Sequence, residues 1–238
     1  MANLSININK VALIRNSRGA NYPDLIKVAK DCEKFGAQGI TIHPRPDERH
    51  ARYADVPALK EVVKTELNVE GNPIPKFLKM VLKHQPHQCT LVPDAPDAIT
   101  SDAGWDTIKH KSFLTDTIAE LKAAGIRTSI FIDPIEAMIE GAKEVGTDRI
   151  EFYTGPYAHN FAKNRKEAVK PYAKCGKLAH KLGLGINAGH DLNTQNLNYF
   201  LRNVGNVAEV SIGHALISDA LYYGLHHTVL MYLHACRK

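Results

Sequence analysis

Short apolar segments of this chain end, one after another, in polar or ionisable side chains. Residues 39–42 run directly into His43, and residues 67–69 run into Glu70. Further segments of this kind end at Asn7, Asp133, Glu151, Asn187 and His214. In a barrel of alternating strands and helices, all the carboxyl ends of the strands lie on one face, and the loops there carry the chemistry. The pattern therefore predicts an enzyme with a single active-site mouth.

Glycines divide the chain into alternating helices and strands. Gly36, Gly125, Gly146 and Gly183 each close an amphipathic segment and precede a β-rich run, as expected where a helix ends in the left-handed conformation. The predicted strands cover residues 4–8, 39–43, 67–70, 88–92, 127–132, 149–153, 185–188 and 208–212. Helices fill the intervals, and the last is expected from about 215 to 236.

Eight strand–helix units without a break in composition predict the α/β fold class. The expected architecture is a single-domain (β/α)8 barrel over residues 1–238, with long loops after strands 1, 2, 4 and 6 and with possible extra helices. Two local features refine it. Asp133 is expected to cap a helix that begins with Pro134, and Pro171 is expected to kink or delay a helix over residues 164–182.

Composition narrows the class of protein further. Of the 238 residues, 44% are hydrophobic and 23% are charged, which suits a globular fold. The first residues do not resemble a secretion signal, and no apolar stretch approaches the roughly 20 residues that span a bilayer. The four cysteines are scattered, which indicates reduced thiols in a cytoplasmic protein. A net charge of +5 is too dispersed to predict binding to nucleic acid.

The loop after the second predicted strand is rich in cationic side chains. Residues 43–52 contain two histidines and three arginines, among them His43, Arg45 and His50. Such groups can hold phosphate oxygens, and His43 at the strand end is available for proton transfer. The alternative is a solvated basic loop, which we consider less fitting because His43 directly follows an apolar strand.

Glu70 ends the third predicted strand. A carboxyl group at the mouth of an apolar barrel has a raised pKa and can serve as a general base. The alternative, equally open from the residues alone, is an acid that caps a helix beginning near Pro73.

Two Gly-His pairs follow the last two predicted strands. They are Gly189-His190 and Gly213-His214. Phosphate sites in such barrels commonly lie after strands 7 and 8, where backbone N–H groups meet a helix N-terminus. A metal site is not expected. The spacing of His84, His87 and Cys89 lies at the opposite end of a strand, and no three-histidine set is evident.

Taken together, these motifs resemble those of the pyridoxine 5'-phosphate synthase family. The resemblance extends from the first strand to the last helix and is carried by Asn7, residues 15–19, residues 39–45 with His50, residues 68–70, residues 91–93 with Thr100, residues 131–133, Glu151 with residues 154–157, residues 187–190 and residues 212–215. Few chains would place all of these motifs in this order.

The resemblance implies an activity and a role for each site residue. The family condenses 3-amino-2-oxopropyl phosphate with 1-deoxy-D-xylulose 5-phosphate and releases phosphate and water, with no cofactor and no metal. By this resemblance the catalytic residues are the bases His43 and Glu70, the acid His190, and Glu151, which stabilises charge in the transition state. The substrate-binding residues implied are Asn7, Asn9, Lys10, Arg18, Arg45, His50, Thr100, Asp191, Gly213 and His214. The resemblance also implies a homo-octamer.

Two positions depart from the family pattern. Asn9-Lys10 stands where an Asp-His pair is usual, and Asp191 stands where glycine is usual. A carboxylate beside a phosphate site repels the phosphate unless it is paired, and Lys10 is a possible partner for Asp191. These departures leave two alternatives open. One is a non-catalytic barrel that binds phosphorylated metabolites, and the other is a different phosphosugar condensing or isomerising enzyme on the same scaffold.

Overall fold

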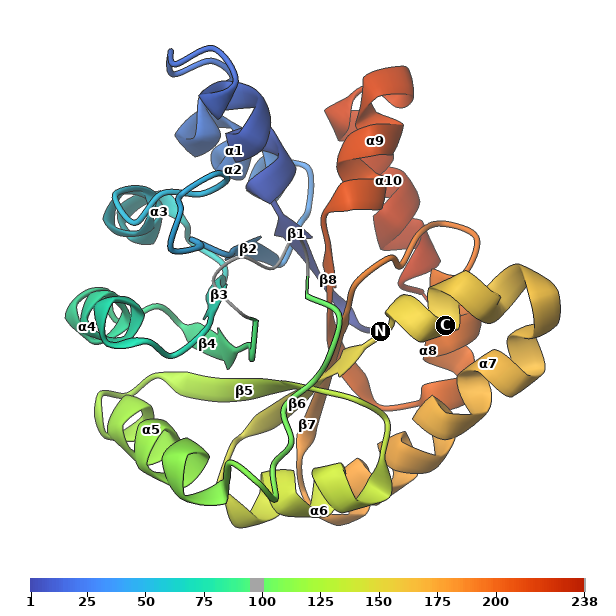
Figure 1. Ribbon diagram of the computed structural model, residues 1–238. Helices are drawn as coiled ribbons and strands as arrows, with labels where there is room; N and C mark the ends of the chain where they lie inside the picture. Colours follow the sequence, from blue (N-terminus) through green and yellow to red (C-terminus); the bar gives the residue numbers. More distant parts are fainter. Residues whose placement is uncertain (95–100, 238) are drawn as a thin grey trace.

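Eight short strands pair in chain order, and the first also pairs with the last, so the sheet closes into a parallel barrel (Figure 1). The computed structural model describes residues 1–94 and 101–237. The strands are β1 (Asn3–Asn7), β2 (Gly39–Ile42), β3 (Leu67–Gly71), β4 (Gln88–Leu91), β5 (Arg127–Ile132), β6 (Arg149–Tyr153), β7 (Gly185–Gly189) and β8 (Val207–Ile212). The predicted (β/α)8 barrel is confirmed, and each strand lies within one residue of its predicted bounds.

Helices surround this barrel (Figure 1). They are α1 (Asn9–Asn16), α2 (Leu25–Lys34), α3 (Asp55–Val62), α4 (Pro75–His84), α5 (Lys111–Ala123), α6 (Glu136–Glu144), α7 (Gly155–Lys181), α8 (Leu197–Val204), α9 (His214–Tyr223) and α10 (Leu225–Ala235). The predicted extra helices are therefore present, since α1 precedes α2 between β1 and β2, and two helices follow β8. None of the helices within the described ranges is long and apolar enough to cross a membrane.

Several sequence-based expectations about loops and helices were wrong. The connections after β1 and β6 are short, because α1 and α7 begin almost at once; only those after β2 and β4 are long. The last predicted helix is two helices, separated at Gly224, whose φ of 73° an α-helix cannot accommodate. The kink in α7 lies at Asn164 and not at Pro171.

The predicted cap at Asp133 is also absent from the structure. Helix α6 begins at Glu136, three residues later than Asp133, and the residue before it makes no side-chain cap. The Asp133 carboxylate instead accepts a hydrogen bond of 2.9 Å from the backbone N–H of Gly104. Asp133 therefore holds the long connection after β4, at Gly104, against the end of β5.

The inside of the barrel is polar, and the apolar core lies between the strands and the helices. Residues that pair in register across parallel strands share a face, and one such row runs through Asn7, Thr41, Asn68 and Gln88. The alternate strand residues, such as Ile40 and Ile42, are fully buried in the hydrophobic core. The expectation of an apolar barrel interior was therefore wrong.

Candidate active site

A cavity of about 340 Å³ lies at the carboxyl ends of the strands. Its lining comes from all eight strand ends and from the loops that follow them. The lining residues are Asn7, Asn9, Lys10, His43, Arg45, His50, Glu70, Val92, Ser101, Phe131, Glu151, Gly189, His190, Asp191, Leu192, Ser211, Ile212, Gly213, His214 and Ala215. The predicted site residues thus gather in one place, with two exceptions. Arg18 is exposed beyond the end of α1, and Thr100 lies outside the described residues.

His43 and Glu70 face each other across the ends of β2 and β3. The Nδ1 atom of His43 lies 3.9 Å from Oε2 of Glu70, and both side chains are largely buried. Burial, and then the positive charge of Arg45, lower the pKa of His43 well below its usual value. His43 is therefore a neutral imidazole at physiological pH, which is the form that accepts a proton.

Glu70 lies inside the barrel and does not cap a helix, since α4 begins only at Pro75. Its pKa is raised to about 8, first by burial and then by the carboxylates of Glu209 and Asp94. The raised pKa was predicted, although the polar interior differs from the apolar surroundings that we expected. A carboxyl group with a pKa near neutral pH suits general acid–base catalysis.

Glu151 points into the same space from β6, directly beside Gly189 on β7. A Cβ atom added to Gly189 would lie 2.3 Å from Oε1 of Glu151, so only glycine leaves room for this carboxyl group. Burial, and then the charge of Glu70, raise the pKa of Glu151 well above its usual value. Two neutral side chains connect the two acids. Thr90 lies 3.5 Å from Glu151 and 3.1 Å from Oδ1 of Asn68, and Asn68 donates to Glu70 at 3.4 Å.

Asn9 connects the first loop to the second. Its Oδ1 accepts a hydrogen bond of 3.0 Å from the backbone N–H of His43, and its own N–H donates to Oδ1 of Asn7. The amide of Asn9 thus contributes to the placement of His43. A side chain that the resemblance implies in substrate binding therefore also has a structural partner here.

Arg45 has a buried partner that the sequence did not reveal. The guanidinium of Arg45 lies 2.6 Å from Oδ2 of Asp94, and both side chains are almost fully buried. The same oxygen accepts a hydrogen bond of 2.7 Å from the hydroxyl of Ser101, and Asn72 donates to the backbone carbonyl of Asp94. Asp94 follows the end of β4, so the rule used for the other strand ends would have identified it.

His50 and Lys10 line the side of the cavity next to Arg45. Burial, and then the positive charge of Lys10, lower the pKa of His50 to about 4. His50 is therefore neutral at physiological pH. In that form it can donate one N–H group to an anion, while Lys10 supplies a full positive charge beside it.

The loop after β7 holds His190 in an uncommon backbone conformation. His190 and Asp191 have φ values of 86° and 59°, and consecutive residues of this kind are rare outside glycine. The hydroxyl of Thr154 lies 2.5 Å from the carbonyl oxygens of both Gly189 and His190, which fixes the loop. The strain lies directly at the cavity.

Asp191 is paired, but its partner is not Lys10. Its Oδ2 lies 3.2 Å from Nδ1 of His190, and this contact is the first cause of its lowered pKa. The expected pairing of Asp191 with Lys10 was therefore wrong. Asp191 thus places a carboxylate directly beside the imidazole of His190.

The last strand end offers backbone N–H groups to the cavity. Helix α9 begins at His214, directly after Gly213. A Cβ atom on Gly213 would lie 3.1 Å from both Cβ and the carbonyl oxygen of Asn7, so glycine allows β8 and β1 to approach here. The N-terminus of a helix attracts anions through its free N–H groups and its dipole.

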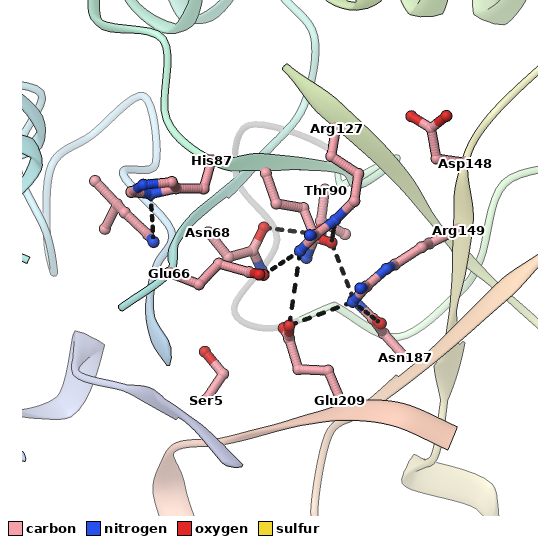
Figure 2. Close-up of polar contacts among 12 residues, drawn as sticks. Ser5, Glu66, Asn68, His87, Thr90, Arg127, Asp148, Arg149, Asn187 and Glu209 are labelled. Atoms are coloured by element: carbon pink, nitrogen blue, oxygen red, sulfur yellow. Dashed lines mark hydrogen bonds and ion pairs between the residues drawn. The ribbon is translucent and has the colours of Figure 1, made fainter. Parts of the chain in front are cut away.

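Below the cavity, a partly buried ionic cluster lies at the opposite end of the barrel (Figure 2). Arg149 on β6 lies 3.5 Å from Glu209 on β8 and donates to Asn187 at 3.0 Å, and Arg127 on β5 pairs with Glu66. Nothing in the hydrophobic pattern predicted this cluster. It accounts for part of the raised pKa of Glu70, because Glu209 contributes to it.

His87, which directly precedes β4, has a structural role. Nδ1 of His87 accepts a hydrogen bond of 3.0 Å from the backbone N–H of Leu67, at the start of β3 (Figure 2). Over residues 1–94 and 101–237, no group of three His, Cys, Asp or Glu side chains is arranged to hold a metal ion. The four cysteines are free and buried.

Solved structures share the fold of this chain. A structure of tryptophan synthase from M. tuberculosis in its aminoacrylate-bound form matches with a TM-score of 0.65 and 11% sequence identity, and the match covers 99% of this chain and 94% of the other. At this level of identity the likeness concerns the fold alone. It agrees with the closed barrel of eight parallel strands.

Relatives of much higher identity cover the whole chain. A pyridoxine 5'-phosphate synthase of Christiangramia forsetii is 61% identical over 233 residues, which is 98% of each chain. One of Cytophaga hutchinsonii is 60% identical over 238 residues, which is all of both chains. The family model described as pyridoxal phosphate biosynthesis protein PdxJ matches residues 4–238. With a barrel fold, a polar cavity at the strand ends and matches of this length, the chain belongs to the PdxJ family of pyridoxal phosphate biosynthesis proteins.

Proposed function

We propose that this chain, a pyridoxine 5'-phosphate synthase by its family and its close relatives, condenses 3-amino-2-oxopropyl phosphate with 1-deoxy-D-xylulose 5-phosphate. The products are pyridoxine 5'-phosphate, inorganic phosphate and water. One observation above all supports the assignment to this cavity. His43, Glu70, Glu151 and His190, which come from four different strand ends, line the same space of about 340 Å³.

His43 and Glu70 are the proposed bases. Addition of the amine to the ketone, enolisation and ring closure all require that protons leave carbon or nitrogen, and a positioned base accelerates each such step. His43 is neutral because of its lowered pKa and accepts a proton directly. Glu70 becomes an effective base as the pH approaches its pKa of about 8.

His190 and Glu151 are the proposed proton donor and charge-stabilising group. His190 lines the cavity with its Nδ1 atom 3.2 Å from the Asp191 carboxylate, which orients the ring, and it is the proposed acid that assists leaving groups. The pKa of Glu151 is raised well above its usual value. A carboxyl group that retains its proton can donate a hydrogen bond to a developing negative charge.

The two phosphates are proposed to bind on opposite sides of these groups. Arg45 and His50 suit the phosphate of deoxyxylulose phosphate, and the resemblance adds Thr100 to them. Gly213 and His214, at the start of α9, suit the second phosphate because backbone N–H groups face it there. The resemblance adds Asn7, Asn9, Lys10, Arg18 and Asp191 to the substrate-binding set.

The test is to incubate the purified protein with both substrates and to follow pyridine absorbance and phosphate release. Each substrate alone is the control. We expect pyridoxine 5'-phosphate and phosphate to appear together, and only when both substrates are present. Binding of both phosphates without any product would contradict the proposed chemistry. Phosphate release from one substrate alone would point to a different reaction.

We also propose that the chain is cytoplasmic and assembles into a homo-octamer. The four free cysteines are in keeping with a reducing compartment. Large apolar side chains are exposed on α1 and α9, among them Ile14 at 46%, Leu221 at 76% and Tyr222 at 85%. An exposed group of this kind is typical of a surface that another protein chain covers.

A further inference from the structure

The extra helix α1 lies against the loop that connects β2 to α3, residues 43–54, which carries Arg45 and His50. At its first residue, Asn9 accepts a hydrogen bond from the backbone N–H of His43, where the loop begins. At its last residue, Asn16 contacts the middle of the loop. The helix therefore touches the loop at its first residue and again five to seven residues further along.

Asn16 holds three consecutive carbonyl groups of the loop. Its Nδ2 atom lies 3.2 Å from the carbonyl oxygen of Glu48, 3.1 Å from that of Arg49 and 2.7 Å from that of His50. The two N–H groups of the amide are thus shared among three acceptors, of which His50 is the nearest. Few single side chains determine the path of three successive peptide groups.

The backbone that Asn16 holds has an uncommon conformation. Glu48 has a φ of 55°, which is uncommon for a residue other than glycine. The turn is closed by a hydrogen bond of 2.9 Å from the N–H of Glu48 to the carbonyl of Arg45. A strained conformation of this kind persists where surrounding contacts hold it in place, and Asn16 supplies three of those contacts.

Asn16 itself is placed by its neighbour Arg15, whose Nε donates a hydrogen bond of 3.1 Å to Oδ1 of Asn16. The guanidinium of Arg15 makes two hydrogen bonds to the carboxylate of Asp55 at 2.7 and 2.9 Å, and only 4% of the Arg15 side chain is exposed. The same carboxylate accepts a hydrogen bond of 2.7 Å from the N–H of Arg52, near the end of the loop. Two parallel hydrogen bonds of this type are strong and directional.

We infer that Asn16 is a positioning residue for substrate binding, which fixes the 48–50 turn so that His50 faces the cavity. This inference rests on the proposed function, because the bound group is the phosphate of 1-deoxy-D-xylulose 5-phosphate. Asn16 does not line the cavity and acts through His50. Its loss therefore weakens binding of that substrate and leaves the proton transfers at His43 and Glu70 largely unchanged.

The experiment compares wild type, Asn16→Ala, Asn16→Asp, His50→Ala and the double variant Asn16→Ala with His50→Ala. Affinity for deoxyxylulose phosphate alone is measured by calorimetry, and KM and kcat are measured with both substrates. Asn16→Asp nearly keeps the shape of the side chain but replaces the N–H donors by oxygens that repel the carbonyls. Asn203→Asp is the matched control, because the Asn203 amide donates to a backbone carbonyl at 2.7 Å on the exposed side of α8.

For Asn16→Ala we expect the dissociation constant and KM for deoxyxylulose phosphate to rise about 10-fold, the size of one or two lost hydrogen bonds. kcat should change less than about twofold, and Asn203→Asp should behave as wild type. When His50 is already replaced by Ala, the further change Asn16→Ala should reduce affinity for deoxyxylulose phosphate much less, because Asn16 acts through His50. Should Asn16→Asp fail to fold, Asn16→Ala provides the same comparison.

Two results would overturn the inference. One is an unchanged affinity for deoxyxylulose phosphate in a folded Asn16→Ala. The other is a loss of affinity on Asn16→Ala that is equally large in wild type and in His50→Ala. A wild-type protein that does not bind deoxyxylulose phosphate at all would instead contradict the proposed function, and the inference with it. The binding measurement distinguishes these cases because it needs no turnover.

Discussion

Glu70 shows what a single buried carboxyl group contributes to this site. It lies inside a polar barrel, 3.9 Å from His43, and its pKa is raised to about 8 by burial and by the carboxylates of Glu209 and Asp94. In an unfolded chain the pKa of a glutamate is about 4.3. Between these values the folded state retains a proton that the unfolded state releases.

This difference makes stability depend on pH. Because the folded state binds the additional proton, the free energy of unfolding falls as the pH rises from about 4.3 to about 8, by up to about 1.4 kcal/mol for each pH unit. Glu70→Gln removes the titration. We therefore expect the variant to gain stability relative to wild type between pH 5 and pH 8, as measured by urea unfolding. Glu140→Gln, at an exposed position, is the control. If the free energy of unfolding of Glu70→Gln differed from that of wild type by the same amount at pH 5 and at pH 8, the pKa of Glu70 would not be raised.

Asp94 offers a second prediction at the scale of one residue. Its charge raises the pKa of Glu70, and it pairs with Arg45, whose charge lowers that pKa. Asp94→Asn should therefore lower the pKa of Glu70 and shift the rise of kcat/KM to lower pH. Asp102→Asn, which is exposed on the same connection, should leave the profile in place. An unshifted profile in Asp94→Asn would remove Asp94 from this role.

At the scale of elements, the loop after β7 depends on one hydroxyl group. Thr154, directly before α7, lies 2.5 Å from the carbonyls of Gly189 and His190 and holds the left-handed backbone at His190. Thr154→Val keeps the shape of the side chain and removes the donor. We expect kcat to fall about 10-fold or more with a smaller change in KM, since His190, the proposed acid, is misplaced. Thr115→Val, which removes an exposed hydroxyl on α5, is the control. A normal kcat in Thr154→Val would show that the loop keeps its conformation without the Thr154 hydroxyl.

The elements also show what the sequence could predict. Strands and their polar ends could be predicted because an apolar run followed by an ionisable residue has one placement in a parallel barrel. The break between α9 and α10 could not, although Gly224 marks it, because a single glycine is tolerated in many helices. The ionic cluster of Arg127, Arg149 and Glu209 could not either, since period-two alternation does not distinguish a polar interior from a solvated face.

At the scale of the whole molecule, the exposed apolar residues of α1 and α9 predict assembly. Light scattering on the purified protein should give about eight times the chain mass of 26.3 kDa. Placing Glu at both Leu221 and Tyr222, which are highly exposed, should reduce this mass, because a buried charge without a partner opposes association. Ile108→Glu, at an exposed site before α5, is the control. A monomeric wild type would contradict the proposed octamer.

The whole barrel brings four acid–base side chains from separate strand ends to one cavity, and Glu70 lies 3.9 Å from His43 among them. The most direct test is single-turnover ring formation by Glu70→Gln, measured together with affinity for deoxyxylulose phosphate. Removal of a general base typically costs about 10²–10⁴ in rate, so we expect a loss of that size with affinity unchanged. Ring formation at the wild-type rate would contradict the assignment of catalysis to this cavity.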